Sequence, residues 1–71
     1  MTAIEFEYLE FLQTEGIVLY LAHDYRKAKA RYERGAELAE QFGMKVWAQY
    51  LGRMAVLCEQ FDREWTMAGR A

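Results

Sequence analysis

Few side chains of this sequence could carry out catalysis. The chain has one histidine, His23, one cysteine, Cys58, and no serine. A nucleophile or a general base works only beside a group that orients it. His23 falls where a helix is expected to end, which is typical of a capping residue. Cys58 lies in an apolar stretch without a cation within one turn, so nothing nearby would activate its thiol. We therefore expect no enzymatic activity.

Metal and cofactor sites have no clear pattern here either. The sequence contains no Cys-x-x-Cys pair, no second histidine and no glycine-rich phosphate loop. Two groups of glutamates could place carboxylates on one helix face: Glu7 with Glu10, and Glu33 with Glu37 and Glu40. Such groups are usually solvated acidic faces. We expect neither a metal ion nor a cofactor.

A basic segment follows an acidic one. Residues 1–24 contain five acidic residues and no Lys or Arg, whereas residues 25–36 contain five basic residues and one acidic residue. These segments suit antiparallel helices whose neighbouring faces attract each other. The basic side chains are candidates for contacting an acidic protein segment or phosphate groups: Arg26, Lys27, Lys29, Arg31 and Arg34. Because the net charge of the chain is −2, nucleic-acid binding is the alternative, not the preferred interpretation.

The elements that position these residues should be helices. The 71 residues include no Pro, Ser or Asn and only five Gly, so turn-forming residues are scarce. Thr2 and Glu5 have the spacing of a capping box, which predicts the start of a first helix. That helix is apolar on more than one side and should end near Ala22 or His23, because Asp24 is a good N-cap for the next helix.

The remaining helices follow from apolar periodicity. We expect a second helix over residues 25–42, ended by Gly43 in a left-handed conformation, and a third helix over residues 44–58. A weakly marked break near Glu59 and Gln60 would be followed by a short fourth helix ending near residue 68. The predicted fold class is all-α, with antiparallel helical hairpins built from three long helices and a short C-terminal helix. Residues 1–71 should form a single domain.

Helix, turn and helix recur at a shift of 36 residues. The first copy contains Gly16, Leu19, Asp24, Tyr25, Ala28, Tyr32, Gly35 and Leu38, and the second contains Leu51, Gly52, Ala55, Phe61, Ala68 and Ala71. These residues resemble the tetratricopeptide repeat, with about one and a half to two repeats present. The chain departs from that pattern at three points. Glu15 stands where the repeat has a leucine before its glycine, and His23 replaces the turn glycine. The closing proline of the repeat is absent.

The resemblance implies how the helices would pack. Small residues let two helices approach closely, so Gly16 and Gly52 would face Ala28 and Gly35. It also implies a groove lined by the first helix of each repeat, and this groove would contain Gln13, Ile17, Tyr20, Leu21, Val46, Gln49, Tyr50 and Arg53. Trp47 and Trp65 are further candidate aromatic anchors, together with Tyr20 and Tyr50. The family's clamp for a terminal carboxylate needs Lys and Asn, which this surface lacks, so an apolar or helical ligand is favoured.

The aromatic content points to protein binding. Four Phe, five Tyr, two Trp and four Met exceed what three or four short helices can bury, and a tightly filled core is the alternative. We expect a protein–protein interaction module: a small adaptor, chaperone or regulatory subunit. The partner would be another protein or a helical peptide. Self-association into a homo-oligomer is also expected, because helical repeats need about three units to cover their apolar ends.

Other interpretations stay open at this point. The chain could be a small nucleic-acid-binding regulator that uses residues 25–36, or a piece of a longer repeat array. The longest apolar run, residues 17–22, is six residues long, so no membrane association is expected. One cysteine and no evident secretion signal favour a cytoplasmic location.

Overall fold

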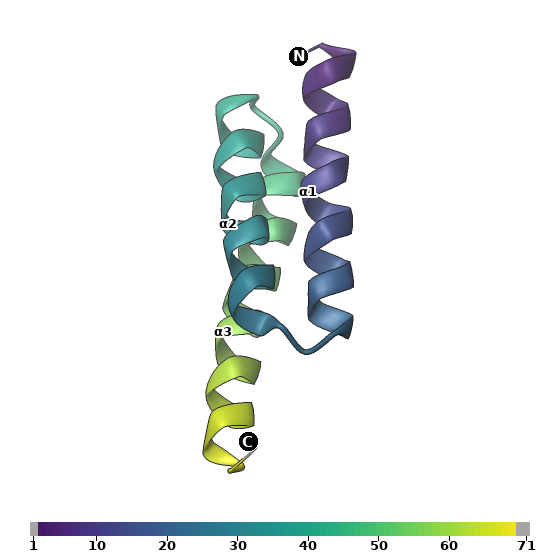
Figure 1. The fold of residues 1–71 in the computed structure, drawn as a ribbon. Helices are drawn as coiled ribbons and strands as arrows, with labels where there is room; N and C mark the ends of the chain where they lie inside the picture. Colours follow the sequence, from purple (N-terminus) through teal and green to yellow (C-terminus); the bar gives the residue numbers. More distant parts are fainter. Residues whose placement is uncertain (1, 70–71) are drawn as a thin grey trace.

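The computed structural model describes residues 2–69, which form three helices: α1 (Ala3–Leu21), α2 (Tyr25–Gln41) and α3 (Lys45–Met67). Each helix runs antiparallel to the one before it, and α2 packs against both of the others (Figure 1). The last turns of α3 extend beyond the turn that joins α1 to α2. The molecule is consequently elongated, with extents of 44 × 17 × 12 Å.

The capping box at the start of α1 is confirmed. The Thr2 backbone N–H donates to the Glu5 carboxylate over 2.7 Å, and the Glu5 backbone N–H donates to the Thr2 hydroxyl over 3.1 Å. These two bonds satisfy amides that have no partner inside the helix. The bond that Glu5 accepts from the Thr2 backbone lowers the pKa of the Glu5 carboxyl below its usual value.

Both turns have the same backbone conformation and the same pattern of hydrogen bonds. His23 and Gly43 have φ angles of 63° and 74°, so both lie in the left-handed region, which the sequence predicted for Gly43. After each of them an amide bonds back to the preceding helix: Asp24 N–H to the Leu19 carbonyl over 2.9 Å, and Met44 N–H to the Ala39 carbonyl over 2.8 Å. This is the Schellman arrangement of helix ends. The first helix was expected to end near Ala22 or His23 and the second at residue 42, and these ends lie within two residues of those observed at Leu21 and Gln41.

The expected break near Glu59 and Gln60 was wrong, because α3 runs unbroken through Met67. The all-α class is confirmed, but the described residues contain three helices and no fourth. Apolar side chains continue in register across the position of the expected break, from Cys58 to Phe61 and Trp65. Carboxylates of the same segment bind α2, since Glu59 lies 3.5 Å from the Lys29 Nζ. Packing thus holds this segment helical where no glycine or proline interrupts it.

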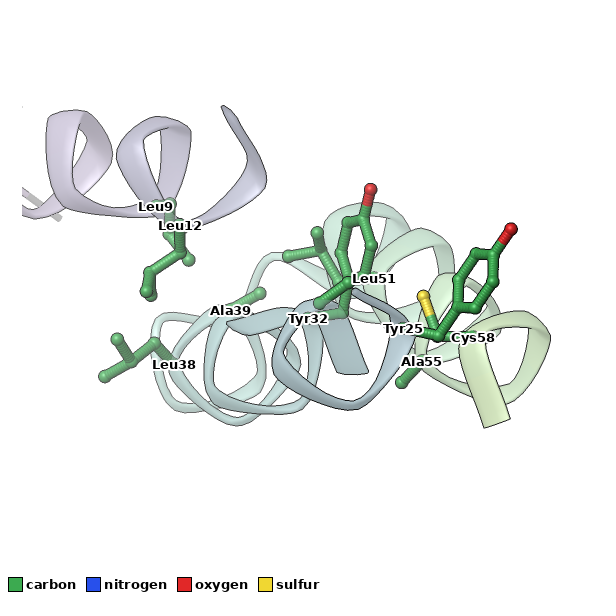
Figure 2. Packing of buried hydrophobic residues seen from close by; sticks show 10 residues of the cluster. Leu9, Leu12, Tyr25, Tyr32, Leu38, Ala39, Leu51, Ala55 and Cys58 are labelled. Atoms are coloured by element: carbon green, nitrogen blue, oxygen red, sulfur yellow. The ribbon is translucent and has the colours of Figure 1, made fainter. Parts of the chain in front are cut away.

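The core lies where α2 meets the other two helices. It contains Leu9, Leu12, Tyr25, Ala28, Tyr32, Leu38, Ala39, Leu51, Ala55 and Cys58 (Figure 2). The Tyr32 ring is fully buried between α1 and α3. It covers Gly16, because a Cβ placed on Gly16 would come within 2.8 Å of the Tyr32 Cζ. Gly16 therefore makes room for an aromatic ring of α2.

The packing expected from the repeat resemblance differs in detail. Gly35 packs against the Leu51 side chain of α3, where an added Cβ would lie 3.0 Å from Cδ1. Gly52 packs against nothing, since no atom lies within 4 Å of the position that its Cβ would occupy. The expectation that Gly52 mediates a close helix contact inside the chain was wrong. Three helices make one complete hairpin and half of another, so the repeat resemblance stays a prediction.

Within residues 2–69, no helix combines the length and the apolar content that crossing a lipid bilayer requires.

Candidate protein-binding surface

The first helix exposes an unusual number of apolar side chains. Only Leu9, Leu12 and Gly16 of α1 are buried. Six large apolar residues on the same helix are exposed: Ile4, Tyr8, Phe11, Ile17, Val18 and Leu21. An outer helix of a globular protein normally has one apolar stripe and a polar opposite face. In α1 the buried stripe is instead flanked by exposed apolar residues on both sides.

One flank, here called the outer strip, consists of Ile4, Tyr8, Phe11 and Val18. Their spacing of four, three and seven residues places them on one side of the helix. Between 45% and 77% of each side chain is accessible, and the rings of Tyr8 and Phe11 stack with centroids 6.4 Å apart. The outer strip was not among the predicted binding residues. Its helical spacing was visible in the sequence, but spacing alone does not distinguish a buried stripe from an exposed one.

A shallow groove separates the outer strip from α2. Its lining residues are Phe11, Thr14, Glu15, Val18, Leu19, Lys27 and Arg31. The Arg31 Nε donates to the Glu15 carboxylate over 2.8 Å across this groove. That ion pair realises the expected attraction between the acidic first helix and the basic second helix. The α1 side of the groove combines the apolar Phe11, Val18 and Leu19 with Thr14 and Glu15, whereas Lys27 and Arg31 form its α2 side.

The other flank of α1 faces α3 and contains the predicted groove in part. Gln13 Nε2 donates to the Tyr50 hydroxyl over 3.3 Å, and a pocket beside that bond is lined by Gln13, Val46, Trp47 and Tyr50 together with Glu10. The structure therefore brings four of the ten predicted partner-binding residues together.

The other members of that prediction are more scattered. Ile17 and Leu21 are exposed on α1. Gln49 and Arg53 are exposed on α3. Gln49 lines a hollow with residues of α2, and Arg53 lines one with Gly52, Val56 and Leu57. Neither of these hollows includes a residue of α1, so Gln49 and Arg53 do not line the predicted groove.

Three of the four predicted aromatic anchors pack against rings of the same chain. Trp47 meets Phe6 edge to face at 5.5 Å, and Tyr20 meets Phe61 at 5.8 Å. Trp65 lies parallel to the His23 imidazole, with ring centroids 4.9 Å apart. These three side chains are half-buried, and they stabilise the packing of α1 on α3 and of α3 on the turn. Only Tyr50 is exposed among the four.

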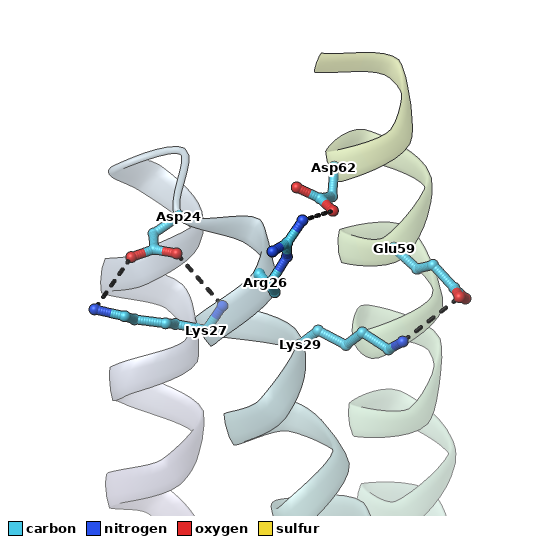
Figure 3. A network of polar contacts seen from close by, with 6 residues as sticks. All are labelled: Asp24, Arg26, Lys27, Lys29, Glu59 and Asp62. Carbon is cyan, nitrogen blue, oxygen red and sulfur yellow. Dashed lines mark hydrogen bonds and ion pairs between the residues drawn. The ribbon is translucent and has the colours of Figure 1, made fainter. Parts of the chain in front are cut away.

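The basic segment is largely neutralised by carboxylates of the same chain (Figure 3). Arg26 pairs with Asp62 at 3.8 Å and Lys27 with Asp24 at 3.8 Å, while Lys29 contacts Glu59 at 3.5 Å and Glu33 at 3.9 Å. Arg31 pairs with Glu15 as described above. Within residues 2–69, Arg34 alone among the five predicted cations has no carboxylate within 4.0 Å. Little cationic charge is therefore left to attract phosphate groups.

Two buried titratable groups are held in their neutral forms. Burial raises the pKa of Tyr32 to about 12, and the nearby Tyr50, Cys58 and Tyr20 contribute in the same direction. Burial also raises the pKa of the Cys58 thiol above its usual value. A thiol must ionise to act as a nucleophile, so this environment opposes reactivity of Cys58. In the part of the chain that the structure describes, no three His, Cys, Asp or Glu residues are arranged to hold a metal ion.

Comparison of the chain with models of protein families, with curated proteins and with solved structures found no match.

Proposed function

We propose that this chain is a protein–protein interaction module whose first helix docks onto a partner protein. The observation that carries the proposal is the outer strip, in which Ile4, Tyr8, Phe11 and Val18 expose about half or more of their surface. Exposed apolar surface that is contiguous on a small domain usually marks an interaction site. Tyr and Phe are also residue types enriched at protein interfaces.

The total accessible surface of the chain supports the same proposal. It amounts to 5015 Å². A compact chain of 8.4 kDa is expected to expose about 4,600 Å². The radius of gyration of 12.8 Å is likewise larger than the value of about 11 Å expected for 71 residues. A partner that covers α1 would bury part of this additional surface.

Recognition would use preformed helices. The three helices are already formed and packed against one another in the chain by itself, so little backbone order needs to be gained on binding. A helical or extended apolar segment fits the outer strip, because the exposed side chains there form a single line along α1. A small adaptor, chaperone or regulatory subunit acts in this way, without chemistry of its own.

The experiment compares capture of partners by variants of the tagged full chain in its own cells. The double variant Phe11→Gln and Val18→Gln replaces exposed apolar groups with polar ones, so it should keep its helical circular dichroism and lose the captured proteins. Ala30→Gln, at an exposed position of α2, is the matched control and should capture the same proteins as the natural sequence. Retention of the same proteins by a folded double variant would refute the role of the outer strip.

A further inference from the structure

The border of the outer strip that faces α2 is basic. The spacing of Lys27, Arg31 and Arg34, four and then three residues, puts them on one side of α2. Lys27 and Arg31 line the shallow groove together with Phe11. Because α2 runs antiparallel to α1 and Arg31 bonds to Glu15, Arg34 lies one turn nearer the start of α1.

One cation of this border has no carboxylate of its own. Lys27 and Arg31 are paired as described above. Arg34 is exposed, and no carboxylate within residues 2–69 lies within 4.0 Å of its guanidinium group. Glu33 and Glu37 of the same helix line the depression between α2 and α3, so they belong to the other side of α2. The border toward α2 therefore keeps a positive charge.

The opposite border of the outer strip is acidic. Glu7 and Glu10 are exposed, and their spacing of three residues puts them on one side of α1. Glu10 lines the pocket between α1 and α3, which identifies this side as the one turned away from α2. Helix α1 contains no Lys or Arg, and among the described residues no cation lies within 4.0 Å of either carboxylate. This border therefore keeps its negative charge.

The separation of charge across the strip restricts what can bind there. A bound segment must place apolar side chains on the strip, carboxylates beside Arg34, and cations beside Glu7 and Glu10. An extended segment has side chains on two opposite faces only, whereas a helix presents them in all directions around its axis. A helix can thus meet all three requirements at once. The α1 of a second copy cannot, because it has no Lys or Arg.

We infer that the outer strip binds an amphipathic helix of a partner protein whose apolar line is bordered by carboxylates on one side and by Lys or Arg on the other. The carboxylates meet Arg34, and the cations meet Glu7 and Glu10. The inference rests on the proposed function, because it specifies the partner of the same strip. Reversing the direction of a helix exchanges its two sides, so the charges also fix the direction in which the partner lies along α1.

Four synthetic helical peptides test the charge pattern, each titrated into the ¹⁵N-labelled full chain. All have one apolar line of Leu and Ala. The first has Glu on one side of this line and Lys on the other, the second has these sides exchanged, the third has Lys on both sides and the fourth has Glu on both. The first two should shift the amide signals of Phe11 and Val18 and bind about fivefold or more tightly than the last two, with a difference that shrinks as salt is added.

A nitroxide label at the N-terminus of each peptide tests the direction of binding. With the first peptide, the label should broaden amide signals at one end of α1 only, either near Ile4 or near Leu21. With the second peptide it should broaden signals at the other end, because the exchanged sides require the reverse direction. Equal broadening at both ends of α1 would contradict the inferred direction.

Two sets of variants assign the borders. The double variant Glu7→Gln and Glu10→Gln should weaken binding of the first peptide about fivefold and leave the peptide with Glu on both sides unaffected. Arg34→Gln should weaken the first peptide and leave the peptide with Lys on both sides unaffected. Glu64→Gln and Arg63→Gln, at exposed positions of α3, are the matched controls and should bind every peptide as the natural chain does.

The outcomes separate this inference from the proposed function. If all four peptides shift the signals of the strip with equal affinity, the charged borders select nothing, and the inference fails while the strip keeps its role as a docking site. If the first two peptides bind without shifting Phe11 and Val18, the inference fails as well. Loss of captured proteins by the Phe11→Gln and Val18→Gln double variant tests the proposed function itself, independently of any peptide.

Discussion

The aromatic ring of Tyr32 on α2 lies directly over Gly16 of α1, so closely that an added Cβ would sit 2.8 Å from the ring's Cζ. Tyr32 is the largest of the fully buried side chains. The contact between the first two helices therefore depends on one position without a side chain and on one large ring. Each of the two residues leads to a test of the packing.

Replacing Gly16 with alanine should destabilise the chain by about 1 to 3 kcal/mol, because the added methyl group overlaps a ring that cannot move inside a filled core. Urea denaturation followed by circular dichroism measures the change. Gly52→Ala is the matched control: it makes the same substitution inside a helix but in open space, so it should raise the stability by up to about 1 kcal/mol. Equal effects of the two substitutions would show that Tyr32 does not pack on Gly16.

Tyr32→Phe removes a buried hydroxyl group that has no hydrogen-bond partner within the described residues. Because an unsatisfied buried hydroxyl is unfavourable, the variant should be as stable as the natural chain at neutral pH or more stable by about 1 kcal/mol. A loss of several kcal/mol in the denaturation experiment would mean that the hydroxyl has a partner in solution.

The same side chain predicts how stability depends on pH. Folding raises the pKa of Tyr32 from its ordinary value of 10.0 to about 12, so the folded state retains the phenolic proton where the unfolded state has lost it. This contribution to stability is complete below pH 10 and is lost as the pH rises toward 12. Denaturation midpoints measured from pH 8 to 12 should fall more steeply for the natural chain than for Tyr32→Phe. Parallel pH profiles would contradict the assignment.

Thr2→Ala tests the capping box. The substitution removes the hydroxyl that accepts from the Glu5 amide, and loss of such a cap destabilises a helix by about 1 kcal/mol. The pKa of the Glu5 carboxyl should then rise toward its usual value, because part of the hydrogen bonding that lowers it is gone. Titration of Glu5 by NMR measures this change, and Thr2→Ser, which keeps the hydroxyl, is the control. An unchanged Glu5 titration in Thr2→Ala would argue against the cap.

Self-association of the chain should be weak and should strengthen with salt. The outer strip offers apolar surface to a second copy, but α1 carries four carboxylates and no cation, so two such helices repel each other at low ionic strength. Light scattering over a concentration series, at low and high salt, measures the oligomeric state. The Phe11→Gln and Val18→Gln double variant should stay monomeric at both. Oligomers that dissociate as salt is added would indicate association through ion pairs instead.

Local sequence signals determined the ends of most elements. The Thr2 and Glu5 capping box and the left-handed residue Gly43 act over four or five residues, and the structure has them where they were predicted. The missing prolines and the apolar periodicity likewise sufficed for the all-α class. These features depend on hydrogen bonds between residues that are close in the sequence, so a short segment of the sequence is enough to predict them.

Contacts between distant residues decided the rest. The helix α3 continues past Glu59, and there Glu59 and Asp62 pair with Lys29 and Arg26 of α2, which are thirty or more positions earlier in the chain. Trp65 was expected to face a partner, but it stacks on His23 because α3 is long enough to reach the first turn. Which flank of α1 stays exposed follows from where α2 and α3 pack. Periodicity specifies that a face is apolar, and only the tertiary arrangement determines whether the protein's own helices cover it.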